Sequence, residues 1–162
     1  MPPNIIHSSG NFLEADAQAL VNPVNCVGVM GKGLALQFKH AFPDSFAAYR
    51  AACTRGVVVP GRMFVTETGL VTGPHLLIHF PTKRHWRDRS LLEDIDTGLT
   101  ALVAKVSARG LRSLAVPALG CGLGGLDWDT VRPLIGEAFA ALPDVRVLLY
   151  GPQEVAEEKA WI

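Results

Sequence analysis

Short apolar segments alternate along the chain with longer segments in which apolar residues recur every three to four positions. The short segments predict six strands, at Asn4–His7, Ala19–Val24, Met63–Glu67, His75–Phe80, Leu111–Val116 and Val145–Tyr150. Several are almost continuously apolar, as is usual for strands covered on both faces. The longer segments predict four helices, at Gly33–Phe42, Asp44–Arg55, Ser90–Arg109 and Trp128–Leu142. This alternation predicts an α/β fold with a sheet between helical layers.

The ends of the helices carry recognisable signals. Pro43 is expected to stop the first helix, and Gly56 the second. Ser90 followed three residues later by Glu93 predicts a capping box at the start of the third helix, and Gly110 its end. Asp127 is the expected N-cap of the last helix.

Composition and charge narrow the classes of function. The 162 residues fit one domain spanning 1–162, and 49% hydrophobic with 19% charged residues excludes a disordered chain. Because 15 basic residues balance 15 acidic ones, binding to long nucleic acid by charge alone is excluded, and any nucleic-acid contact is expected to be local.

The cysteines, the N-terminus and the apolar runs indicate the compartment of the protein and the features it is expected to lack. Cys26, Cys53 and Cys121 are odd in number and widely spaced, which predicts reduced thiols in a cytoplasmic protein and neither a disulfide framework nor a metal site. The sequence also shows no signal peptide and no apolar run long enough to span a membrane. No cofactor is expected.

The first candidate site is the glycine-rich segment Asn25–Gly33, which follows the strand Ala19–Val24. Glycines let backbone approach a ligand closely, and a helix begins directly after them. Asn22 and Asn25 lie at the end of the strand, where short amides can bind ligand hydroxyls. A plain turn with amide caps is the alternative, and the two asparagines favour a binding site.

The second candidate site is Pro117–Asp127, which joins a buried strand to a helix. Backbone N–H groups beside a helix N-terminus favour a phosphate or diphosphate. Gly120, Gly122 and Gly125 also satisfy the spacing of a dinucleotide-binding fold, but no acidic residue ends the next strand, Val145–Tyr150. That fold is therefore disfavoured.

The third candidate site is Phe80–Arg89, the most basic stretch of the chain. Its cations, histidine and tryptophan are a combination suited to phosphate and base contact. We therefore assign contact with DNA or a base to Arg84, His85, Trp86 and Arg87. A solvated loop is the alternative, and it suits Asp88 and Arg89 better than it suits Trp86.

Together, the three segments resemble the macrodomain family over essentially the whole chain. Within that family, Gly120-Cys121-Gly122-Leu123 and the lysine-bearing segment are similar to the branch of terminal ADP-ribose glycohydrolases. Pro81-Thr82-Lys83-Arg84-His85-Trp86-Arg87 and the Pro117–Leu126 segment look like the antitoxin members of that branch. Those members remove ADP-ribose from DNA bases, often thymidine, and so reverse a partner ADP-ribosyltransferase toxin.

The resemblance implies a three-layer α/β/α sandwich with a mixed, mostly parallel sheet of about six strands. It implies that Lys83 is catalytic. It assigns ADP-ribose binding to Asn11, Asn22, Asn25, Gly31, Lys32, Gly33, Gly120, Cys121, Gly122, Leu123 and Gly124. The expected partners are ADP-ribose, ADP-ribosylated single-stranded DNA and a cognate toxin. Because antitoxin members usually carry a further toxin-binding region, the chain is expected either to be the N-terminal catalytic part of a longer antitoxin or to act without that region.

Two positions depart from the family pattern. Asn11 stands where many macrodomains place an adenine-reading aspartate, and Gly124 stands where protein-directed members of the branch place an aspartate beside the lysine. Gly124 favours the DNA-directed subgroup. The rival functions are an ADP-ribose reader without catalysis, and a hydrolase of ADP-ribosylated glutamate or of ADP-ribose 1''-phosphate.

Two catalytic roles are possible for Lys83. As a neutral amine it would attack the anomeric carbon of the ribose, which requires a depressed pKa. As a cation it would stabilise or protonate the departing base.

Overall fold

The computed structural model of the chain describes residues 1–152. Its elements are, in chain order, β1 (Ile5–Ser8), η1 (Phe12–Glu14), β2 (Ala19–Asn25), α1 (Gly33–Ala41), α2 (Pro43–Thr54), β3 (Phe64–Glu67), β4 (Leu76–Lys83), α3 (Leu92–Ala108), β5 (Ser113–Val116), η2 (Gly122–Gly124), α4 (Trp128–Phe139) and β6 (Arg146–Tyr150). All six predicted strands and four predicted helices are confirmed, with ends that differ by a few residues.

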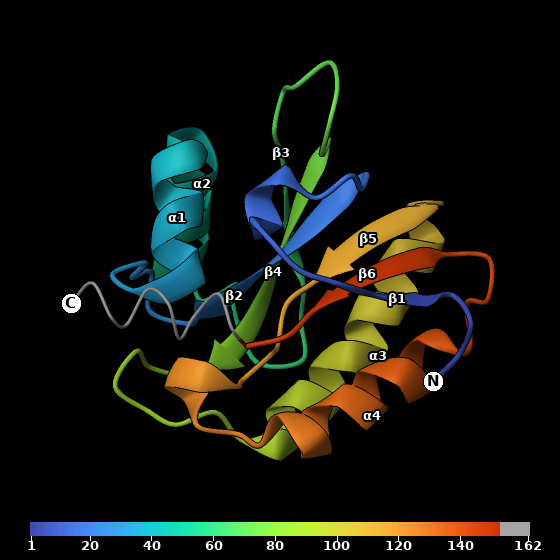
Figure 1. Cartoon of the computed structure of the whole chain (residues 1–162). Coiled ribbons are helices and arrows are strands. Elements are labelled where there is room, and N and C mark those ends of the chain that lie inside the picture. The colour runs from blue at the N-terminus through green and yellow to red at the C-terminus, as the bar shows by residue number, and fades with distance from the viewer. Residues whose placement is uncertain (153–162) are drawn as a thin grey trace.

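The strands form one sheet in the order β1-β6-β5-β2-β4-β3. Every neighbouring pair is parallel except β3 and β4, which are antiparallel. In Figure 1, α1 and α2 lie on one side of this sheet, and α3 and α4 lie on the other. The fold is therefore the expected three-layer α/β/α sandwich with a mixed, mostly parallel sheet.

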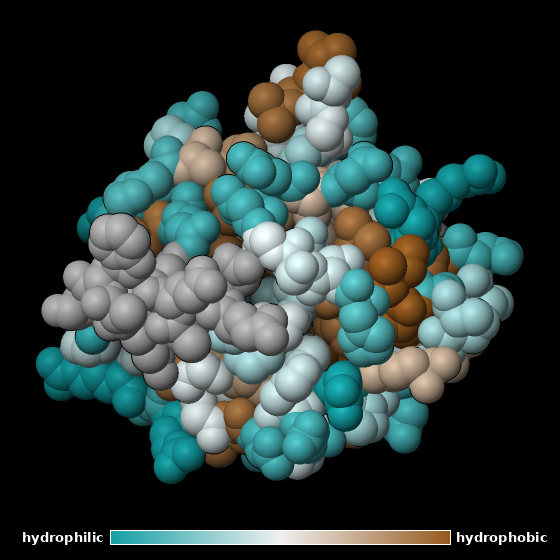
Figure 2. Space-filling view, viewed as in Figure 1, coloured by the Kyte–Doolittle hydropathy of each residue, from teal (hydrophilic) through white to brown (hydrophobic). Residues whose placement is uncertain are grey.

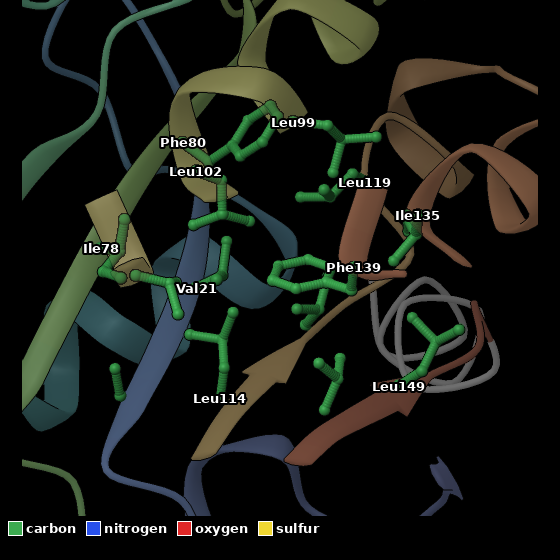
Figure 3. Close-up of a cluster of buried hydrophobic side chains, with 14 of the residues drawn as sticks. Val21, Ile78, Phe80, Leu99, Leu102, Leu114, Leu119, Ile135, Phe139 and Leu149 are labelled. Atoms are coloured by element: carbon green, nitrogen blue, oxygen red, sulfur yellow. The ribbon is translucent and has the colours of Figure 1, made fainter. Parts of the chain in front are cut away.

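Consecutive strand residues contribute to opposite cores, because side chains alternate across a sheet. Val21, Ile78 and Leu114 belong to the cluster shared with α3 and α4, where Leu102 and Phe139 are fully buried (Figure 3). Their strand neighbours pack in the other direction, against Phe12 of η1 and Phe38 of α1; these neighbours are Leu20, Leu77 and Ala115. The sheet is thus covered on both faces, as the apolar strands predicted.

The start of α3 departs from the sequence prediction. The capping box is wrong: α3 begins at Leu92, its N-cap is Leu91, and no side chain caps it. Ser90 instead lies buried beside Gly124, and its backbone N–H donates to the Gly124 carbonyl at 3.0 Å. A contact with a residue 34 positions away therefore competes with the local helix signal. The Asp127 cap is confirmed, since its side chain accepts from Asp129 N at 3.2 Å.

The end of β4 also differs from the prediction, because the strand continues through Lys83 rather than ending at Phe80. Lys83 is thus the last residue of a central strand, and the loop begins only after it. The loop between β3 and β4 projects from the molecule, and Leu70 and Val71 expose apolar side chains there (Figure 2). No helix within residues 1–152 is long and apolar enough to span a membrane.

Candidate active site

A cavity of about 610 Å³ opens where the carboxyl ends of the parallel strands meet. Ligands in open α/β sheets bind beyond this edge, and the volume is within the usual range for a small-molecule site. All three glycine-rich or basic segments contribute to its walls, through Asn25, Gly31, Lys83 and Gly120 among others. The site predicted from three separate stretches of sequence is one place in the fold.

The first loop is held in shape by Asn25. Its Oδ1 accepts from the N–H groups of Val27 and Val29, at 3.0 and 3.3 Å, and its Nδ2 donates to the carbonyl of Val29 at 2.7 Å. Asn25 is 7% exposed but still lines the cavity. Its side chain therefore organises the loop as well as bordering the ligand space.

The N-terminus of α1 also faces the cavity. Gly33, Leu34 and Ala35 line the wall, and the N-cap residue Lys32 makes no side-chain capping hydrogen bond. The first N–H groups of a helix lack partners within the helix and attract anions, particularly beside a lysine. Gly31, Lys32 and Gly33, for which ADP-ribose binding is predicted, thus lie on the cavity wall beside a helix N-terminus.

Asn22 does not line the cavity. It is fully buried, and its Nδ2 lies 3.2 Å from Nδ1 of His79 and 4.0 Å from Sδ of Met30. Burial lowers the pKa of His79 to about 4, so its ring is neutral at pH 7 and Nδ1 accepts from the amide. The structure therefore places Asn22 in a polar contact beneath the site rather than in it.

The second loop contributes Gly120, Cys121, Leu123 and Gly124 to the cavity, whereas Gly122 is exposed and does not line it. Gly120 has φ +73°, and a Cβ there would lie 2.7 Å from Cδ1 of Leu126. The short helix η2 makes no side-chain cap hydrogen bond at Cys121. Glycine at position 120 thus permits both the positive φ and the close packing of the loop.

Gly124 packs closely against Ser90. A Cβ on Gly124 would clash with Ser90 Oγ and lie 3.0 Å from Ser90 Cβ. Any side chain at position 124 would therefore require Ser90 to shift.

Lys83 lies directly beside the first loop, because its Cα is the register partner of Asn25 in the parallel pair of β2 and β4. The Lys83 side chain lines the cavity, and Nζ donates to the Trp86 carbonyl at 3.4 Å. Trp86 and Arg87 line the cavity as well, and the Arg87 guanidinium lies 4.6 Å from the centroid of the Trp86 ring. A lysine, an indole and a guanidinium thus share one rim.

Arg84 and His85, for which contact with DNA or a base is predicted, do not line the cavity. Arg84 makes two 3.1 Å hydrogen bonds to the buried carboxylate of Asp94 in α3. His85 Nδ1 accepts from the backbone N–H of Arg87 at 3.1 Å. Both side chains hold the loop itself, through partners that sequence spacing did not reveal.

Sequence reasoning missed an aromatic wall. Phe12 and Tyr150 line the cavity and pack edge to face, with ring centroids 5.0 Å apart. Asn11 does not line the cavity: it caps η1, and its Oδ1 accepts from Leu13 N at 3.1 Å. Tyr150 is the last residue of β6, so its position at the carboxyl end of a strand was the available signal. The pair suits the face or edge of a flat ring.

The charges of the cavity favour an anion. Among its described lining residues are four cationic side chains, Lys32, Lys83, Arg87 and Arg89, and a single carboxylate, Asp88. Burial raises the pKa of the Cys121 thiol to about 11, so this lining residue is neutral and a poor nucleophile. Within residues 1–152, no group of three or more His, Cys, Asp or Glu side chains is placed to hold a metal ion.

The sequence was compared with protein families and with curated proteins. The model of the family described as "Macro domain" matches residues 21–135. The chain is 53% identical over 148 residues to the DNA ADP-ribosyl glycohydrolase of Mycobacterium tuberculosis, covering 91% of this chain and 42% of that protein. It is 37% identical over 166 residues to a DNA ADP-ribosyl transferase-DNA ADP-ribosyl glycohydrolase fusion protein of Thermosipho africanus, covering 93% and 42%.

Two solved structures are similar over most of the chain. The macrodomain of Mycobacterium tuberculosis DarG superposes with a TM-score of 0.89 at 53% identity, covering 90% of this chain and 96% of that one. Thermosipho africanus DarTG in complex with ADP-ribose superposes with a TM-score of 0.86 at 36% identity, covering 94% and 42%. The chain thus spans about 42% of the length of these two curated relatives.

Proposed function

The chain belongs to the macrodomain family, and on this basis we propose that it binds ADP-ribose and hydrolyses the bond joining it to a DNA base. The observation that carries the proposal is the position of Lys83. It lies on the wall of a cavity whose other walls are two glycine-rich loops and the N-terminus of α1. Lys83 lies beside Asn25 at the carboxyl end of β4, which favours hydrolysis over binding alone.

The proposed orientation of the ligand follows from the chemistry of the walls. The diphosphate would accept hydrogen bonds from the loop around Gly120 and from the N-terminus of α1, where Lys32 adds a positive charge. The adenine would lie against Phe12 and Tyr150. The distal ribose would then lie beside Asn25, within reach of Lys83.

The proposed leaving group is a base on single-stranded DNA. Trp86 is 45% exposed at the rim, although exposed tryptophan is uncommon, and it carries Arg87 over its ring. An indole stacks on bases regardless of sequence, and a guanidinium pairs with phosphate. A base inside a duplex could not reach the cavity without being flipped out of the stack.

For Lys83 we propose the cationic role rather than that of a nucleophile. Its amino group already donates to the Trp86 carbonyl, next to where the base would stack. As the C–N bond breaks, the electron pair of that bond moves to the base nitrogen, and the ammonium stabilises this charge and donates a proton to the nitrogen. Water supplies the oxygen that bonds to the anomeric carbon, and the proton that water loses restores the ammonium through solvent.

We also propose a partner and a location for the protein. A relative fuses a DNA ADP-ribosyl transferase to a glycohydrolase of this kind. This supports a role as the antitoxin that reverses a transferase toxin in the cytoplasm, and thereby repairs modified DNA. The chain would be the catalytic part of such an antitoxin, since its relatives are longer.

The experiment that tests the function compares three substrates. The protein is incubated with single-stranded DNA ADP-ribosylated on thymidine, the same DNA modified on guanosine, and a protein ADP-ribosylated on glutamate. We expect release of ADP-ribose from DNA, with thymidine preferred, and none from glutamate, since residue 124 is a glycine and carries no carboxylate. Tight ADP-ribose binding without release from any substrate would favour a reader, and release from glutamate alone would contradict the DNA assignment.

A further inference from the structure

The catalytic strand is irregular at the point where it meets the cavity. Along β2 and β4, Val24 pairs with Pro81, but the next residue, Asn25, pairs with Lys83. Thr82 is therefore an extra residue on β4, which defines a β-bulge. Pro81, directly before it, has no backbone N–H to donate to the ladder.

The bulge changes which side chains reach the cavity. Consecutive residues of a regular strand point to opposite faces of the sheet, so Thr82 and Lys83 would diverge. Both line the cavity, at the point where the register between β2 and β4 shifts. The irregularity thus lies directly before Lys83, and a contact that holds this strand end in place also restrains the lysine backbone.

Tyr49 of α2 touches the strand end opposite the bulge. It is fully buried, and its hydroxyl lies 2.7 Å from the carbonyl oxygen of Asn25 and 3.0 Å from its Oδ1. Burial raises the pKa of Tyr49, which keeps the phenol protonated and able to donate. The ring stacks on His79 of β4, with centroids 5.7 Å apart and planes inclined by 26°.

The contact with Asn25 connects three parts of the site. Asn25 Oδ1 also accepts from Val27 and Val29, so the same oxygen fixes the first loop. The next residue, Cys26, donates from its N–H to the Arg84 carbonyl at 3.3 Å and from Sγ to the Lys83 carbonyl at 3.6 Å. A shift of Asn25 is therefore passed directly to the backbone of Lys83.

We propose that Tyr49 is a positioning residue for the hydrolysis: its hydroxyl fixes the end of β2 against the bulge in β4, and so sets where Lys83 stands relative to the bound ribose. Tyr49 does not line the cavity, and its hydroxyl acts through Asn25. The proposal rests on the proposed function, and it adds a requirement outside the ligand-contacting residues.

The test is the isosteric substitution Tyr49→Phe, which removes only the hydroxyl. Because a displacement of about 1 Å can cost about 100-fold in rate, we expect kcat on ADP-ribosylated DNA to fall about 10- to 100-fold. The Kd for ADP-ribose is expected to stay within about threefold, since most of its contacts are unchanged. Calorimetric stoichiometry gives the folded fraction, and a fall in kcat per folded protein with Kd unchanged is a result that a general loss of stability would not produce.

The matched control is Ser113→Ala, at the opposite end of the sheet. Ser113 is also buried, and its hydroxyl accepts from Gln18 N at 2.8 Å, so this variant loses a comparable buried hydrogen bond away from the site. It should lower Tm with kcat unchanged. A Tyr49→Phe variant with the kcat of the unsubstituted protein, or a Ser113→Ala variant with the same loss of kcat, would overturn the positioning role. Absence of turnover in the unsubstituted protein would instead overturn the proposed function and with it this role.

Discussion

Gly124 and Ser90 are in close contact at the cavity. The backbone N–H of Ser90 donates to the Gly124 carbonyl, and Ser90 Oγ lies close to where a Cβ of residue 124 would be. At the scale of single residues, this packing leaves little room for a side chain at position 124.

Replacing Gly124 with aspartate is expected to destabilise the fold rather than to create a lysine–aspartate pair. Overpacking of this kind typically costs about 1–3 kcal/mol, measurable by urea denaturation. Gly31→Ala is the control, because a Cβ there meets only Val29 Cγ1 at an ordinary 3.6 Å. Adding Ser90→Gly to Gly124→Asp should recover part of the loss. Full stability of the Gly124→Asp single variant would show that the contact is not restrictive.

At the scale of elements, the segment between β4 and α3 divides its basic residues between two tasks. Arg84 pairs with the buried carboxylate of Asp94 and so joins the strand end to the first turn of the helix. Arg87 stacks on Trp86 at the cavity rim. Two arginines three positions apart, both exposed, thus have different expected roles.

Arg84→Ala and Arg87→Ala form a matched pair that separates these roles. Arg87→Ala should raise KM for ADP-ribosylated DNA and reduce the slope of log K against log salt by about one, as for loss of one phosphate contact. Arg84→Ala should lower Tm, because Asp94 loses its partner, and leave that slope unchanged. Binding of DNA at several salt concentrations, with thermal unfolding of both variants, provides the comparison. Equal salt slopes for the two variants would count against the division.

At the scale of the whole molecule, the sequence predicted the layers well because apolar periodicity reports burial directly. The three segments lie at one edge of the sheet, because loops that follow parallel strands share that edge. The sequence did not reveal that Arg84 is held by Asp94, that Asn22 is held by His79, or that Ser90 is held by Gly124. These polar side chains have partners distant in sequence, which a pattern read along the chain does not encode.

The burial of His79 has a consequence for the stability of the whole fold. Burial lowers its pKa to about 4 in the folded protein, from an ordinary value of 6.5, so the unfolded chain binds the proton more readily. The stabilisation is complete above pH 6.5 and is lost as the pH falls toward 4, by up to about 3 kcal/mol. Thermal unfolding from pH 7.5 to 4.5 should show this decline, and His79→Gln should flatten it. An unchanged pH profile in that variant would assign the decline to other groups.

The central claim is that Lys83 carries out the hydrolysis while the glycine-rich loops hold ADP-ribose. The most direct test measures both properties in the Lys83→Ala variant, with Lys105→Ala on α3 as the control lysine, which does not line the cavity. We predict an ADP-ribose Kd close to that of the unsubstituted protein by calorimetry, and no release of ADP-ribose from modified single-stranded DNA. Release at the unsubstituted rate by Lys83→Ala would contradict the account.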